Sequence, residues 1–280
     1  YEDTGDAERA AQCYAEVLQA APRDAPQAKF AALHRAQCLL QAGDTLSAIR
    51  DFEALRAADG QDPKFLEPLA QAYLAVSLID EARQAAESLL TADPANRAGL
   101  HVLAAVAQQT GDWKRAAAAY HGATAQAEGD AGLWLDAAEA SLHAGESTAA
   151  AGAVEKALVG PGDLALRRRA AHVLVGLGRS TRAATLLKGV ASAQPEEPSV
   201  WIELADVAEG AGDLPTSIDA LSHVAGLLPG DAEIQARRAA ALWSAGRQTE
   251  SIGAWQKTLE LTPDDVRIQR SLARALVDNE

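Results

Sequence analysis

The chain has 280 residues, of which 48% are apolar but only 4% aromatic, so much of its apolar content is alanine, the best helix former. Its 25 basic and 39 acidic residues give a net charge of −14, which disfavours nucleic acid, because binders of polyphosphates need a positive stripe to displace counterions. Two cysteines make no disulfide framework, and no apolar run approaches the ~20 residues that cross a bilayer.

The first segment, 1–22, reads as one amphipathic helix after a turn at Gly5. Ala10, Tyr14 and Leu18 recur at the i, i+4, i+8 spacing of one helix face, which predicts a buried stripe. The helix that should pair with it is missing or lies upstream. We therefore expect the chain to begin inside a structural unit and to be a segment of a longer protein.

The segment 29–62 predicts two helices around a turn at Gly43. This glycine lies 38 residues after the preceding turn, four more than the later spacing of 34, and four residues are about one helical turn. Asp24 followed by Gln27 is typical of an N-cap with a capping-box partner. We expect a first helix that is one turn longer and begins at about 25, and a second helix over roughly 46–58.

The segment 63–96 predicts the same two-helix unit with two irregular residues. Pro68 lies inside the first helix, and proline removes a helical N–H and clashes with the preceding turn. That helix is expected either to begin near Leu66 or to be kinked. Ser77 stands where the other units have a turn glycine, which leaves the local turn shape open.

The units 97–130 and 131–163 follow, and the second ends in the run Val-Gly-Pro-Gly-Asp at 159–163, one residue short of the period. This is the strongest punctuation in the chain and favours a change of superhelical bend. Three further units, 164–197, 198–231 and 232–265, turn at Gly178, Gly212 and Gly246 and end at Pro195, Pro229 and Pro263. The segment 266–280 predicts a lone first helix with Ile268, Leu272, Ala273 and Leu276 in register, so this end is also expected to be cut.

One alanine position carries the period through the whole chain, at steps of 34, 34, 34, 33, 34, 34 and 34: Ala36, Ala70, Ala104, Ala138, Ala171, Ala205, Ala239 and Ala273. A second small residue follows on the second helix of each unit, for example Ala82, Ala116, Ser217 and Ser251. The two positions predict a close helix crossing that only small side chains allow. Larger residues are expected to fill the wedge beside it: Phe52, Tyr73, Tyr120 and Trp255.

A helix–turn–helix period of 34, with a large–Leu–Gly–Tyr pattern, then A-x3-F and a late Pro, is the signature of the tetratricopeptide repeat. The chain resembles this family over its full length. The resemblance implies an all-α fold, a single α-solenoid over 1–280 that forms a right-handed superhelix. It also implies a non-enzymatic scaffold that binds a protein or peptide in its concave groove. The alternatives are a regulatory or substrate-docking module of a longer enzyme, and an RNA-reading helical repeat, which the charge disfavours.

The resemblance places the groove on the first helices. Carried over by repeat position, it is lined by Lys64, Glu67, Gln71, Leu74, His101, Ala105, Gln108, Leu135, Asp136, Glu139, Leu142, Arg168, Arg169, His172, Val175, Ile202, Glu203, Asp206, Glu209, Ala236, Arg237, Ala240, Trp243, Arg267, Arg270, Arg274 and Val277. No unit has the Lys–Asn pair of the carboxylate clamp found in chaperone-binding members, so a chaperone-tail receptor of that type is rejected.

Charges on this groove alternate from unit to unit, which predicts a partner site or ion pairs between neighbouring first helices. The candidate partner-binding residues are Trp243, Arg237, Arg270, Arg274, Arg168, Arg169 and His172. An aromatic residue beside arginines is typical of an interface hot spot. The competing interpretation is that Trp243 packs on the aliphatic stems of Arg270 and Arg274.

No residue pattern indicates catalysis or a cofactor: the chain has no P-loop, no Cys-x-x-Cys and no His-Glu-x-x-His. Gly176 and Gly178 resemble part of a dinucleotide loop, but no strand precedes them. His34 and Cys38 lie four residues apart with Cys13 on the helix expected beside them, yet we expect neither a metal nor a disulfide there. The compartment stays open: cytoplasm is favoured, with the bacterial periplasm or a membrane-anchored parent as alternatives.

Overall fold

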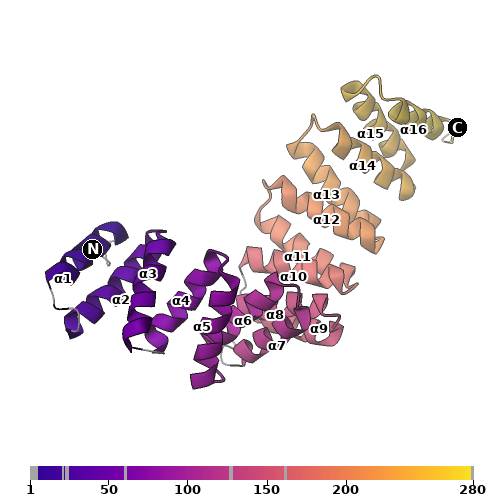
Figure 1. The fold of residues 1–280 in the computed structure, drawn as a ribbon. Coiled ribbons are helices and arrows are strands. Elements are labelled where there is room, and N and C mark those ends of the chain that lie inside the picture. The colour runs from indigo at the N-terminus through magenta and orange to yellow at the C-terminus, as the bar shows by residue number, and fades with distance from the viewer. Residues whose placement is uncertain are drawn as a thin grey trace. The chain divides into compact units, whose positions relative to one another are not determined.

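The computed structural model describes residues 6–20, 22, 25–59, 62–125, 129–160 and 163–278. These residues form sixteen α-helices and no strand, so the fold is all-α (Figure 1). In chain order the helices are α1 (Ala7–Ala20), α2 (Pro26–Gln41), α3 (Thr45–Asp59), α4 (Pro63–Ala75), α5 (Ile79–Ala92), α6 (Arg97–Gln109), α7 (Trp113–Thr124), α8 (Ala131–His143), α9 (Ser147–Ala157), α10 (Leu164–Gly176), α11 (Ser180–Ala193), α12 (Pro198–Ala211), α13 (Leu214–Leu227), α14 (Ala232–Ser244), α15 (Gln248–Leu261) and α16 (Val266–Val277).

The chain divides into two compact units, Tyr1–Lys156 and Ala157–Glu280. Each helix packs against the next, from α1 to α8 in the first unit and from α10 to α16 in the second. In the first unit α2 also packs against α4, and α4 against α6. The first helices of successive pairs therefore lie side by side there and share one face. The predicted change of bend at 159–163 includes residues 161–162, which lie outside the described residues, and it stays a prediction.

The predicted helix crossings are filled by small, fully buried residues. On the first helices, 0% of the residue is exposed at Ala36, Ala70, Ala104, Ala138, Ala171, Ala205 and Ala239. On the second helices the same holds for Ala48, Ala82, Ala116, Ala150, Ala183, Ser217 and Ser251. Because both members of a crossing lack long side chains, the two helices can approach closely, as the sequence predicted. The exception is Ala273, which is exposed because no described helix covers that face of α16.

The turn inside each pair is left-handed at one residue. Its φ is positive at Gly43, Gly111, Gly145, Gly178, Gly212 and Gly246, and Ser77 takes the same region with φ 60. The residue after the turn then donates its N–H back to the first helix, as Arg247 does to the Leu242 carbonyl at 2.9 Å. This closes the helix end. The serine therefore keeps the turn that glycine makes elsewhere, at a steric cost.

Two helix starts differ in detail from the sequence expectations. The first helix of the 29–62 unit is longer, as predicted, but its N-cap is Ala25 without a side-chain hydrogen bond, and Asp24 lies outside the described residues. Helix α4 begins at Pro63 rather than near Leu66, because Asp62 caps it by accepting from the Lys64 N–H, and Pro68 lies in its interior.

The late prolines end their units and are not the first residues of the next helices. Pro195, Pro229 and Pro263 lie in turns, and each following helix begins three residues later. At two of these sites an aspartate caps the helix, as Asp231 does by accepting from the N–H groups of Glu233 and Ile234. In the N-terminal helix, Ala10 is buried while Tyr14 and Leu18 are half-buried, and Gly5 lies outside the described residues. Trp255 is half-buried rather than fully packed into its wedge.

Candidate functional site

In the second unit, two of the predicted basic residues are held by a carboxylate on the neighbouring first helix. Arg168 donates from Nε to Oε2 of Glu203 at 2.5 Å. His172, one turn further along α10, lies with its Nε2 against Oε1 of the same carboxylate. Glu203 is largely buried, whereas His172 is exposed. This cluster ties α10 to α12, and the guanidinium of Arg168 is engaged in an ion pair with an internal carboxylate.

Arg237 on α14 makes a second link of this kind. Its Nη2 pairs with Asp206 and donates to Oε2 of Glu209 at 3.1 Å, both on α12. Burial lowers the pKa of the Arg237 guanidinium, but the hydrogen bond to Asp206 and the charge of Glu209 outweigh it and raise the pKa. The guanidinium therefore remains charged and bound to α12. Ion pairs between neighbouring first helices, one of the two interpretations of the charge alternation, are therefore present in this part of the groove.

The C-terminal candidates Trp243, Arg270 and Arg274 make fewer internal interactions. Trp243 on α14 is half-buried, and no described aromatic ring stacks on it. Arg270 is exposed and makes no ion pair with any described residue, while Arg274 pairs with Asp278 on its own helix at 3.6 Å. Arg169 is half-buried. Among the described residues, no hydrogen bond, ion pair or ring contact joins these arginines to Trp243, so their joint role stays a prediction.

A separate cavity of about 600 Å³ lies between α14, α15 and α16. It is lined by Arg237 and Arg267, by the carboxylates Glu233 and Asp265, and by the half-buried ring of Trp255. Arg267 is paired with Asp265 at 2.9 Å. The sequence assigned Trp255 to core packing. The structure shows that the Trp255 ring also lines a cavity. The residue spacing along one helix could not predict this, because the cavity is bounded by three helices.

The first unit carries similar links on its first helices. Asn96 donates from its side-chain amide to Glu67 of α4 at 2.9 Å, and Arg97 pairs with Asp130 at the start of α8. A cavity of about 530 Å³ opens between α4 and α6, lined by Glu67, Gln71, Asp93, Asn96, Arg97, Ala98 and His101. One predicted groove residue is wrong: Leu135 is fully buried, because its side chain packs into the interior rather than facing the groove.

The sequence analysis missed one aromatic cluster in the first unit, formed by Tyr14, Phe30 and His34. Phe30 of α2 is 57% exposed, and its ring lies 4.1 Å from that of His34. Tyr14 of α1 stacks on His34 at 5.7 Å. Phe30 stands at the same repeat position as the groove residue Lys64. Applying the groove register to the 29–62 unit would have found it.

The two cysteines differ in exposure. Cys38 is buried beside Ala10 and Ala11, Cys13 is exposed, and both are free thiols. Among the described residues, no group of three or more His, Cys, Asp or Glu side chains is placed to hold a metal ion. None of the described helices has the length and apolarity to span a membrane.

Stacked helix pairs with small residues at their crossings and left-handed turns inside each pair define an α-solenoid repeat protein. A family model described as tetratricopeptide repeat matches residues 1–63, 33–97, 101–165 and 168–232. The chain belongs to the tetratricopeptide repeat family, whose repeats generally serve as non-catalytic modules for protein interaction.

Solved structures share this fold at low identity. The C-terminal part of a tetratricopeptide repeat-containing protein from Cytophaga hutchinsonii matches with 16% identity and a TM-score of 0.68, over 86% of this chain and 99% of that one. A tetratricopeptide repeat protein from Parabacteroides merdae matches with 14% identity and a TM-score of 0.58, over 89% and 99%. YrrB, described as a tetratricopeptide repeat protein with an unusual peptide-binding site, matches with 17% identity and a TM-score of 0.51, over 68% and 98%. No curated protein matches the chain.

Proposed function

We propose that this chain is a non-enzymatic scaffold that holds a partner peptide or protein surface on the face formed by its first helices. The observation that carries the proposal is that Trp243 has no stacking partner and Arg270 no ion-pair partner among the described residues of the second unit. A half-buried indole with no stacking partner and an exposed, unpaired guanidinium are the groups that interface hot spots use. A free scaffold and a docking module of a longer enzyme would both bind on this face.

The internal ion pairs reduce the number of residues that are available to bind a partner. Because Arg168, His172 and Arg237 already contact carboxylates of α12, they position neighbouring helices, and a partner would have to displace those contacts. Arg270 and Arg274 are exposed and lie on the next first helix. We therefore place the binding of an acidic or aromatic-containing segment on Trp243 with Arg270 and Arg274. Phe30 is the corresponding exposed anchor in the first unit.

A protein partner is favoured over nucleic acid on the same grounds. The net charge is −14, and several arginines on this face are neutralised by internal carboxylates. A nucleic-acid site needs several free cations along one track. Filter binding with single-stranded and duplex nucleic acid at low salt should show no retention by this protein, and salt-dependent retention would refute this part of the proposal.

The test is site-specific photo-crosslinking in the organism or extract from which a partner is captured. A photoreactive residue at the exposed position 240, on the first-helix face, should crosslink the partner. One at the exposed position 189, on second helix α11, should not. Trp243→Ala should abolish the crosslink from position 240 with little change in thermal stability.

Trp201 supplies a matched control for the tryptophan change. Its indole Nε1 donates to the Pro195 carbonyl at 3.1 Å and its ring stacks on His223 at 4.1 Å, so it serves the fold. Trp201→Ala should lower stability and leave the crosslink in place. The reverse result, in which Trp243→Ala destabilises the protein and spares the crosslink, would mean that Trp243 only covers its neighbours.

A further inference from the structure

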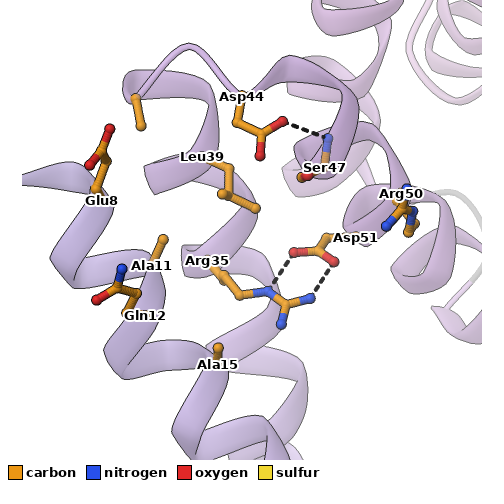
Figure 2. Close-up of a pocket in the computed structure, with 11 residues that line it drawn as sticks. Glu8, Ala11, Gln12, Ala15, Arg35, Leu39, Asp44, Ser47, Arg50 and Asp51 are labelled. Atoms are coloured by element: carbon orange, nitrogen blue, oxygen red, sulfur yellow. Dashed lines mark hydrogen bonds and ion pairs between the residues drawn. The ribbon is translucent and has the colours of Figure 1, made fainter.

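A cavity of about 490 Å³ lies in the first unit between two second helices, α1 and α3, with the first helix α2 as its floor. Figure 2 shows the residues that line it: Glu8, Ala11, Gln12 and Ala15 on α1, Arg35 and Leu39 on α2, and Asp44, Ser47, Arg50 and Asp51 at α3. None of these belongs to the groove positions of the first helices. The cavity is therefore distinct from the surface proposed above.

A bidentate ion pair crosses the floor. Arg35 donates from Nε to Oδ2 of Asp51 at 2.6 Å and from Nη2 to Oδ1. Asp51 is 8% exposed, so its charge is nearly removed from water. The remaining nitrogen, Nη1, donates to no described residue, and in Figure 2 the unbonded end of the guanidinium points toward α1 on the side of Ala15. Asp51 thus holds a guanidinium rigidly with donors left over inside the cavity.

The other repeats show that stacking does not require this pair. The position of Arg35 is apolar in the next five units: Leu69, Leu103, Ala137, Ala170 and Leu204. The position of Asp51 is apolar in the same units: Ala85, Ala119, Ala153, Leu186 and Ala220. The unit after these has Arg238 at the position of Arg35, which donates to Ser222, and it has Ala254 at the position of Asp51. Burying an ion pair costs desolvation free energy that an apolar pair avoids. Because the Arg35–Asp51 pair occurs in one unit only, we look for a role for it other than stabilising the stack of helices.

The cavity itself exists because α1 carries small side chains here. Ala15 stands where the following two second helices have Glu53 and Glu87, long side chains that would project into the equivalent space. Ala11, Ala15 and Leu39 instead leave an apolar wall beside the Arg35–Asp51 pair. The site therefore combines room, an apolar surface and fixed hydrogen-bond donors.

The charges around the cavity decide what it accepts. Glu8 lies in the first turn of α1, and Asp44 accepts from the Ser47 N–H at 3.2 Å at the start of α3, so helix N-termini offset both. The hydrogen bond from the Ser47 hydroxyl lowers the pKa of Asp44. Arg50 is exposed and makes no hydrogen bond or ion pair with any described residue. Arg50 interacts with Asp44 through its charge only, and Nη1 of Arg35 donates to no described residue. Both cations therefore keep N–H groups that no described residue accepts.

We propose that this cavity is a second interaction surface, which seats an acidic side chain of a partner protein between α1 and α3. The carboxylate accepts from Nη1 of Arg35 and pairs with Arg50, and apolar neighbours in the same partner segment pack on Ala11, Ala15 and Leu39. A small free carboxylate would leave most of about 490 Å³ empty and the apolar wall uncovered. The net charge of −14 repels acidic partners at long range. At physiological ionic strength salt screens this repulsion beyond about 8 Å, so the contacts with Arg35 and Arg50 inside the cavity dominate the binding energy.

The experiment follows backbone amide shifts of the isotope-labelled chain by NMR during titration with blocked tripeptides. The probe has a central glutamate between two leucines, and the matched probes have glutamine or lysine at the centre. We expect the glutamate peptide to shift amides in 8–15 and 35–51, with an affinity about tenfold above that of the glutamine peptide, because the charge-assisted hydrogen bond is lost. The lysine peptide should not bind there.

The chain's own repeats supply the variants. Ala15→Glu places in the cavity the residue that the next second helices carry, and it should weaken binding of the glutamate peptide about tenfold or more. The double change Arg35→Leu with Asp51→Ala reproduces the apolar pair of the next unit and should do the same. Gln71→Ala, on the first-helix face, is the control and should leave these shifts unchanged.

Four results would overturn the proposal: equal binding of the glutamine or lysine peptide, binding that survives both sets of changes, shifts confined to the first-helix face, or no saturable shift in 8–15 and 35–51. The amide spectrum of each variant reports its fold directly. Should the double variant lose its native spectrum, Ala15→Glu decides the outcome alone, because position 15 is partly exposed and tolerates a longer side chain in register.

Discussion

Ser251 on α15 donates its hydroxyl hydrogen to the backbone carbonyl of Ala239 on α14, with the two oxygens 2.7 Å apart. Both residues are fully buried, and they occupy the two small positions of one helix pair. A side-chain oxygen reaches the backbone of the partner helix only where the two helices cross closely. The contact therefore shows that the 34-residue alanine period marks helix crossings.

Enlarging a crossing residue should destabilise its pair. We expect Ala104→Leu and Ala205→Leu each to lower the free energy of unfolding by about 1–3 kcal/mol, because both sites are fully buried and a larger side chain forces the helices apart. Chemical denaturation measures the effect. Ala118→Leu, at an exposed site on α7, is the control and should change stability little. Unchanged denaturation midpoints for both buried variants would refute the assigned register.

Breaking the Arg35–Asp51 pair from one side should cost more than replacing both partners. Arg35→Leu alone leaves the buried Asp51 carboxylate without its donors, and we expect a loss of about 1–3 kcal/mol. Adding Asp51→Ala should recover most of that loss, since the next unit has Leu69 and Ala85 at these positions, both buried in its apolar core. Thermal or urea unfolding of the three proteins tests this. A double variant less stable than the single one would contradict it.

Two glycines should respond oppositely to alanine. A methyl group added at Gly189, an exposed position of α11, meets no other atom within 4 Å, and Gly189→Ala should stabilise the protein by about 0.5–1 kcal/mol. At Gly99 the same methyl would lie 3.1 Å from Cγ of Leu90 and 3.2 Å from the Ala86 carbonyl oxygen. Gly99→Ala should therefore destabilise by about 1–3 kcal/mol, through the contact between α5 and α6. Stabilisation by both changes would show that this contact is loose.

Tyr73 should titrate late and make stability fall at high pH. Burial, together with its hydrogen bond to Glu53 at 2.8 Å, raises the pKa of the phenol from 10.0 to about 12. Between these values the unfolded chain has lost the proton that the folded chain keeps. The free energy of unfolding should thus decrease as pH rises from about 10 to about 12. Phenolate absorbance and unfolding measured at stepped pH test this, and Tyr73→Phe should remove that part of the slope. A tyrosine spectrum with all phenols titrating near 10 would contradict it.

The two cysteines should react at different rates. Cys13 is exposed and Cys38 is buried between α1 and α2, so a thiol reagent should label the first quickly and the second only on opening of the helix pair. After denaturation without reductant, two thiols should be titrated per chain. Finding no free thiol would show that a disulfide joins the two cysteines. Finding one zinc ion per chain would contradict the expectation that these residues bind no metal.

The architecture could be predicted because the period of a tetratricopeptide array is a one-dimensional property of the sequence. The alanine steps from Ala36 to Ala239 and the turn glycines identify the crossings and the left-handed turns, and the structure has both. Helix starts and the exposure of individual side chains, which the repeat spacing does not determine, were predicted less well. Of the two expectations for α4, a start near Leu66 is wrong, because Asp62 caps the helix before Pro63. Leu135 was assigned to the groove although the residue is fully buried.

The sequence by itself determined the fold class, the helix pairs and the charge alternation along the first helices, since each follows from residue type and spacing. Only the tertiary structure decided which charges are internally satisfied. Arg168 meets Glu203 across 35 positions, and Arg35 meets Asp51 across 16. It also decided where cavities remain, because a void depends on the side chains of three helices at once. Such contacts are set by how helices pack in space, which no single stretch of sequence records.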